Sequence, residues 1–163
     1  YGTDFRAIMP TNLYGPNDNY NLTTSHVLAS LIKKILTAKK NNKKIVTIWG
    51  NGKPKREFLH VDDFAEACIK IMSISKKKYL KITGKDNQFI NVGSGKEISV
   101  KDLALLISDI VNYKGRFKYD KTKPNGTMRK LIDSSKIKQL NWHPKTTIRL
   151  GIETVIEKLN LHE

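Results

Sequence analysis

The chain has 163 residues, is 39% hydrophobic and 28% charged, and carries a formal net charge of +15. This composition is typical of one globular domain or of a large part of a bigger protein, and it excludes a wholly disordered chain. The apolar runs are too short to span a membrane, and the single cysteine, Cys68, excludes an internal disulfide, so we expect a reducing, cytoplasmic location.

The predicted elements alternate between strands and helices, which is typical of an α/β fold. A strand at 5–9 is followed by a polar loop and by a helix that begins near Thr24 or Ser25. The elements expected further along are strands at 45–49 and 56–61, a helix after Asp62 and Asp63, a strand at 89–92, a helix after Ser99, a strand at 117–119, and helices at 134–140 and 148–159.

Three local signals sharpen this prediction. The run Gly50-Asn51-Gly52 contains Asn-Gly, a strong hairpin signal, so we expect the strands on either side of it to pair as a hairpin. Ser99 with Asp102 resembles a capping box at the start of a helix. The lysine run at 76–78 is expected to be a loop.

The positive charge is concentrated in lysine-rich stretches. Such charge attracts phosphate of any kind, including nucleotides and nucleic acid. Aromatic residues make up only 8% of the chain and are not interleaved with the basic residues, as they are in single-strand nucleic-acid binders. The pattern therefore favours a solvated lysine-rich surface over a nucleic-acid surface. The residues concerned are Lys33, Lys34, Lys39, Lys40, Lys43, Lys44, Lys76, Lys77 and Lys78.

Few residues carry a chemical signal by themselves. The turn Gly93-Ser94-Gly95 lacks the third glycine of a dinucleotide-binding fingerprint, so we interpret it as a turn. Trp49 and Arg56 flank the expected hairpin, and a flat indole beside a planar guanidinium suits a nucleotide. No metal site is expected, because no two histidines stand at metal-ligand spacing among His26, His60, His143 and His162.

Several motifs occur together in one enzyme family. They are P-T-N-L-Y-G-P-N-D-N at 10–19, I-W-G-N-G at 48–52, R-E-F-L-H-V-D-D at 56–63 and I-N-V-G-S-G at 90–95. Together they resemble the extended short-chain dehydrogenases/reductases. The runs S-H-V at 25–27 and K-P-N-G-T-M-R-K-L at 123–131 resemble the members of that family that epimerise and reduce GDP-4-keto-6-deoxy-mannose with NADPH.

The resemblance implies roles for individual residues. It implies that His26 acts as an acid in epimerisation and contacts the cofactor. It implies further cofactor contacts from Pro10, Thr11, Asn12 and Leu13, and substrate contacts from Lys34, Trp49, Arg56 and Arg116.

The resemblance also implies a domain organisation, that of the C-terminal half of such an enzyme. Residues 1–25 would end the Rossmann portion with its cofactor-side loop, and residues 26–163 would form the smaller α/β portion that binds the nucleotide sugar. The family's glycine-rich cofactor turn, its catalytic serine and its Y-x-x-x-K pair would precede these residues, and Tyr1 is not the family's tyrosine, because position 5 is Phe5 and not lysine. We therefore expect the whole enzyme to be a homodimer that uses NADP, and this chain alone to be inactive and to bind NADP(H) weakly.

Two alternatives stay open from the sequence. The first is another NDP-sugar epimerase or dehydratase of the same fold, because such enzymes share the motifs at 50–52 and 56–63. The second is a non-catalytic basic module that binds nucleic acid or another protein.

Overall fold

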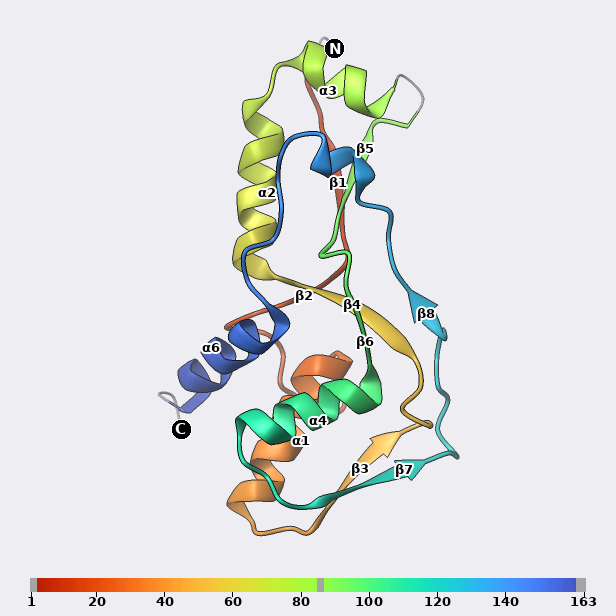
Figure 1. The fold of residues 1–163 in the computed structure, drawn as a ribbon, viewed down its shortest axis with the longest axis vertical. Coiled ribbons are helices and arrows are strands. Elements are labelled where there is room, and N and C mark those ends of the chain that lie inside the picture. The colour runs from red at the N-terminus through yellow and green to blue at the C-terminus, as the bar shows by residue number, and fades with distance from the viewer. Residues whose placement is uncertain (1–2, 85–86, 161–163) are drawn as a thin grey trace.

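The computed structural model describes residues 3–84 and 87–160, so Tyr1 and His162 lie outside the described residues. Helices and strands alternate along an elongated molecule, which confirms the predicted α/β fold (Figure 1). The elements in chain order are β1 (Ala7–Pro10), β2 (Asn12–Tyr14), α1 (Val27–Lys40), β3 (Ile45–Trp49), β4 (Lys55–His60), α2 (Val61–Ser73), α3 (Lys76–Thr83), β5 (Phe89–Val92), β6 (Glu97–Ser99), α4 (Val100–Ile110), β7 (Arg116–Asp120), β8 (Arg129–Lys130), α5 (Ser135–Lys138) and α6 (Ile148–Asn160).

Strand β4 is the centre of the largest sheet. Its second half pairs in parallel with β2, and its first half pairs with antiparallel β6 and parallel β8. Two further parallel pairs, β1–β5 and β3–β7, complete the strands of the described residues. Residues 57–60 of β4 are all buried, as is typical of a central strand.

The predicted hairpin between β3 and β4 is wrong. Strand β3 pairs with β7 instead, with Ile45 opposite Arg116 and Trp49 opposite Asp120. Gly50 and Gly52 do adopt the positive φ of a turn, so the signal marked a change of direction correctly. It could not specify the strand partner, because β3 alternates buried and exposed residues like an edge strand whereas β4 is buried almost throughout.

The helix starts show where local signals hold and where they fail. Helix α4 is capped as predicted, because Ser99 Oγ accepts the N–H of Asp102 at 3.0 Å. Helix α1 begins at Val27, and its N-cap residue, His26, lies one or two positions after the predicted cap at Thr24 or Ser25. The lysine run at 76–78 is the first turn of α3 and not a loop, because the Ser75 hydroxyl caps this helix and Tyr79 buries its inner face.

Buried apolar side chains form two separate clusters. The first cluster packs α1, α4 and α6 against β3 and includes Ile32, Ile48 and Ile107; we name it the pocket core, because the cavity described below opens beside it. The β1–β5 core packs α2, α3 and α5 against the β1–β5 pair and includes Ile71 and Ile90. In Figure 1 the β1–β5 core lies in the upper half and the pocket core in the lower half, with β4 running between them.

Over residues 3–84 and 87–160 no helix is both long enough and apolar enough to cross a membrane.

Candidate functional site

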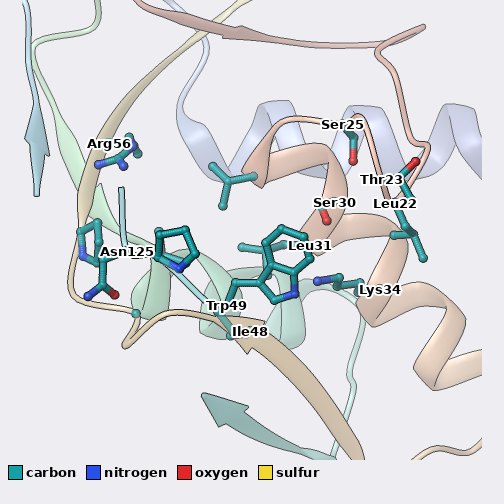
Figure 2. Close-up of a pocket in the computed structure, with 15 residues that line it drawn as sticks. Leu22, Thr23, Ser25, Ser30, Leu31, Lys34, Ile48, Trp49, Arg56 and Asn125 are labelled. Carbon is teal, nitrogen blue, oxygen red and sulfur yellow. The ribbon is translucent and has the colours of Figure 1, made fainter. Parts of the chain in front are cut away.

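A cavity of about 240 Å³ opens between four segments of the pocket-core region. Helix α1 forms one wall, the end of β3 and the start of β4 form the floor, and the late loop (residues 121–128) closes one side. Figure 2 shows Lys34 and Trp49 side by side in this pocket, with Arg56 and Asn125 entering from the opposite side. The pocket therefore unites segments that are far apart in the sequence.

Trp49 is the aromatic surface of the pocket. As the last residue of β3 it is 57% exposed, so its indole ring is open to solvent. The ammonium groups of Lys34 and Lys123 lie 5.3 and 5.6 Å from the indole, within cation–π distance. Trp49 thus offers a flat stacking surface next to two positive charges.

Lys34 projects from the middle of α1 towards the floor of the pocket. Its Nζ donates a 3.4 Å hydrogen bond to the carbonyl of Thr47 in β3. Partial burial lowers the pKa of the Lys34 ammonium, because removal from water disfavours the charged form. A bound anion would restore the favourable environment that this charge has lost.

Arg56 connects the pocket floor to the late loop. Its Nη1 donates to the carbonyl of Thr127 at 2.6 Å and to that of Lys55 at 2.8 Å. Asn125 makes a second connection, because its Oδ1 accepts the N–H of Asn51 at 2.7 Å. The remaining N–H groups of the Arg56 guanidinium can serve a ligand, since the side chain carries five donors.

The charged side chains that line the pocket are all positive. Its lining includes Lys34 and Arg56 and contains no aspartate or glutamate. Ser25 adds a hydroxyl that is buried and has no hydrogen-bond partner among the described residues. This combination of cations, a polar donor and a flat ring can hold a molecule that carries both phosphate and an aromatic base.

Two other predicted site residues lie elsewhere. His26 is exposed at the start of α1, and its neighbours Ser25 and Val27 line the pocket while His26 itself does not. Arg116 is opposite Ile45 at the far end of the β3–β7 pair, about 13 Å along the strand from Asp120 at about 3.3 Å per residue. The structure therefore joins Lys34, Trp49 and Arg56 in one pocket and leaves Arg116 outside it.

The predicted cofactor-side loop follows β1. Thr11 Oγ1 and Asn12 Nδ2 donate to the carbonyl of Glu57 at 3.3 and 2.7 Å, so both side chains hold the loop against β4. Pro10 is the last residue of β1 and Leu13 lies within β2.

The glycine turn after β5 does not form a cofactor cradle. Gly95 donates its N–H to the Glu57 carboxylate at 2.6 Å, and a Cβ at Gly93 would collide with the same carboxylate. The space that a pyrophosphate would need in a dinucleotide-binding turn is therefore filled by an acidic side chain. This agrees with the interpretation of Gly93-Ser94-Gly95 as a turn.

The other candidate residues have structural surroundings. His60 is buried in β4, and its Nδ1 accepts the N–H of Asp62 at 3.3 Å. Burial raises the pKa of the Cys68 thiol, which keeps it in its unreactive form. Across residues 3–84 and 87–160, no three His, Cys, Asp or Glu side chains are placed to hold a metal ion.

Sequence reasoning assigned no role to three residues that the structure places at the pocket. Lys123 and Asn125 belong to the K-P-N-G-T run, which was noted only as a motif. Ser25 was taken as a possible helix cap, but its hydroxyl caps nothing and lines the cavity. The lysine and proline of this exposed run could have indicated a binding role, because residues that bind ligands often lie on loops.

Comparison with known proteins identifies the family of the chain. The NAD dependent epimerase/dehydratase family matches residues 1–93. The chain is 41% identical over 157 residues to the GDP-L-fucose synthase of Escherichia coli (strain K12), an alignment that covers 96% of this chain and 49% of that protein.

Solved structures give the same result. A GDP-6-OMe-4-keto-L-xylo-heptose reductase from C. jejuni matches with a TM-score of 0.90 at 33% identity, covering 100% of this chain and 56% of that one. A GDP-L-fucose synthetase from Naegleria fowleri bound to NADP matches with a TM-score of 0.83 at 27% identity, covering 97% and 47%. The chain thus spans about half the length of the relatives that it matches. It belongs to the NAD dependent epimerase/dehydratase family, in which it is a homologue of the GDP-L-fucose synthases.

Proposed function

We propose that this chain supplies the GDP-sugar pocket of an NADPH-dependent enzyme that epimerises and reduces GDP-4-keto-6-deoxy-mannose to GDP-L-fucose. The observation that carries the proposal is the exposed Trp49 between two lysines, in a pocket lined by Arg56 and by no carboxylate. The similarity to GDP-L-fucose synthases supports the choice of a GDP-sugar over other nucleotide sugars.

The pocket residues have separate tasks in this proposal. Arg56 and Lys34 hold the diphosphate, since a guanidinium binds phosphate through paired N–H donors and an ammonium binds it as a point charge. Trp49 stacks on a flat part of the nucleotide. Lys123 brings a third charge from the late loop, so the loop closes over an anion more readily than over an empty pocket.

His26 is proposed as the group that hands a proton to the sugar during epimerisation. It stands at the N-terminus of α1, and Lys34 lies eight residues further along, a rise of about 12 Å at about 1.5 Å per residue. Such a separation suits a proton donor at the sugar and a cation at the phosphate of one extended ligand.

The cofactor side of the proposal is confined to the loop Pro10–Leu13 and to His26. NADP(H), when bound, supplies the hydride for the 4-keto carbon. The proposal assigns residues 1–25 to that side and residues 26–163 to the nucleotide-sugar side, and it makes the whole enzyme a homodimer. For this chain alone it expects no reductase activity and weak NADP(H) binding. A micromolar dissociation constant for NADPH in a fluorescence titration would contradict the last point.

Tryptophan fluorescence tests the pocket directly, because the chain has only two tryptophans and they differ in exposure. Trp49 lies in the pocket, whereas Trp142 is buried in the β1–β5 core. GDP should quench the emission of Trp142→Phe saturably and leave that of Trp49→Phe almost unchanged. Equal quenching of the two variants, or no saturable quenching in either, would overturn the proposed pocket.

A further inference from the structure

Glu57 is a fully buried carboxylate in β4, one residue after Arg56 in the pocket. Its Oε1 accepts the N–H of Gly95 at 2.6 Å, and its Oε2 accepts the N–H of Ile132 at 3.2 Å. Burying an ionised carboxylate is costly unless hydrogen bonds replace its hydration. These two charge-assisted bonds therefore tie both backbone segments firmly to β4.

The main chain of Glu57 holds a third segment. Its carbonyl oxygen accepts Asn12 Nδ2 at 2.7 Å and Thr11 Oγ1 at 3.3 Å. One residue of the central strand thus joins the loop after β1, the turn after β5 and the chain that follows β8.

Both segments that the carboxylate holds lead to the pocket. The turn at Gly95 continues through β6 to Val100, which lines the cavity, and the N–H of Lys101 bonds to the carbonyl of Gly52 at 2.9 Å. In the other direction, Ile132 follows β8 and the late loop that carries Asn125. The Glu57 carboxylate is the bridge between these two walls.

The chemistry of the position requires glutamate. A carboxylate accepts hydrogen bonds at both oxygens, whereas a glutamine of the same shape would place an N–H₂ group against one of the two backbone N–H donors. The fit also requires Gly93, since a Cβ there would collide with Oε1 and Oε2. Glu57 and Gly93 therefore form one matched pair.

We propose that Glu57 is a positioning residue for the pocket: it fixes the turn 93–95 and the chain at Ile132 so that Val100 and the late loop face each other across the cavity. It acts through these segments and touches no ligand. The expected effect of Glu57 on GDP affinity rests on the proposed function. Its effect on the order of the turn 93–95 and of the chain at Ile132 does not.

The test compares Glu57→Gln with Glu66→Gln in the intact protein. Glu66 undergoes the same chemical change but pairs with Lys145 on an exposed surface, and it does not line the cavity. Hydrogen exchange measured by mass spectrometry should become about ten- to a hundredfold faster in the peptide, containing Gly95 or Ile132, whose N–H then faces the glutamine NH₂ group. The other peptide should change less, because its N–H keeps an acceptor that no longer carries a charge. Trypsin should also cut faster after Arg129 and Lys130, which directly precede the segment at Ile132. Glu66→Gln should change neither readout.

GDP affinity gives the functional readout. Glu57→Gln should weaken GDP binding, measured by Trp49 fluorescence, by about tenfold, whereas Glu66→Gln should leave it unchanged. If wild-type protein does not bind GDP, the proposed function fails, and the exchange data still decide the role of Glu57. Unchanged exchange at both segments would overturn the inference.

A structural role alone would look different from positioning. It would accelerate exchange throughout β3, α4 and the β1–β5 core together, in step with a lower melting temperature, and that outcome also overturns the inference. If Glu57→Gln fails to fold, Gly93→Ala takes its place, because it displaces the carboxylate without removing its charge. It should reproduce the local exchange pattern and the loss of GDP affinity.

Discussion

The pocket core and the β1–β5 core are built from the same kinds of element but differ in how completely they are covered. Three long helices, α1, α4 and α6, enclose the pocket core. The β1–β5 core has the short helices α3 and α5 beside α2, and large apolar side chains remain exposed around it. They are Phe5 at 82%, Ile69 at 70%, Met72 at 60% and Met9 at 53% exposure, whereas the large apolar side chains on the elements of the pocket core do not exceed 57%, at Trp49.

This difference separates two tasks within one chain. The region with the enclosed core carries the candidate pocket, so its ligand groups project from elements that are packed into that core. The region with the open core carries the loop Pro10–Leu13, which our proposal places on the cofactor side. The following predictions test how independent the two regions are.

The largest effects are expected from truncation inside each core. Ile32→Ala and Ile71→Ala remove side chains with no exposed surface, and each should lower the free energy of unfolding by about 2–5 kcal/mol. Ile32 lies on α1 next to Lys34, so its truncation should also abolish GDP binding. Ile71→Ala should keep GDP affinity within about twofold if the cores are independent. Urea denaturation and GDP titration of both variants measure this, and equal loss of affinity would show that they are coupled.

The next effect concerns Arg56, at the boundary between the regions. Arg56→Ala should reduce the catalytic efficiency of the whole enzyme with its nucleotide sugar about ten- to a hundredfold, because charge-assisted bonds to phosphate are lost. Arg56→Lys should recover only part, since the paired donors are absent. The melting temperature must be measured on the same variants, because Arg56 also bonds to Thr127. Unchanged efficiency beside a lower melting temperature would give Arg56 a purely structural role.

A smaller effect should appear with pH. Burial lowers the pKa of Lys34, so this ammonium loses its proton at a lower pH than an exposed lysine does. Phosphate binds the charged form, and GDP affinity should therefore fall as the pH rises through that lowered pKa. Lys34→Arg stays charged over the same range and should keep its affinity. Parallel pH profiles for the two proteins would exclude Lys34 as the titrating group.

The smallest effect is expected at Ile69. This residue lies on α2, two positions before Ile71, but is largely exposed. Ile69→Ala should change the free energy of unfolding by no more than about 0.5 kcal/mol, and it is the matched control for Ile71→Ala. A loss as large as that of Ile71→Ala would mean that Ile69 is covered in solution, which analytical ultracentrifugation can check.

Local features of the sequence predicted the elements well. The Ser99 and Asp102 pair specifies its helix because both partners of the hydrogen bonds lie within one turn. Apolar spacing likewise located α1, whose Leu28, Leu31, Ile32 and Ile35 are buried. The missed helix α3 had its signal in Ser75 and Tyr79, but the lysine run between them was taken for a loop.

Long-range pairing could not be predicted from these signals. The partner of β3 lies beyond α4, and no local property of Ile45–Trp49 distinguishes β7 from β4 as a neighbour. The pocket was predicted only in part for the same reason. Trp49 and Arg56 were expected to be close through a hairpin, but they share the cavity because the late loop and α1 close around both. Nothing in the sequence indicated that Glu57 is buried, because local sequence does not distinguish a buried glutamate in a strand from an exposed one.

The register of the β1–β5 pair has a consequence for the growing chain. Ala7 pairs with Phe89, so β1 leaves the ribosome 82 residues before its partner does. At about 5–20 residues per second, this wait lasts on the order of 4–16 s. During that time the short strand has no β5 edge to pair with, and its open edge is a site for wrong contacts. Chaperone dependence in synthesis should therefore originate at β1, although the finished chain shows nothing unusual in that strand.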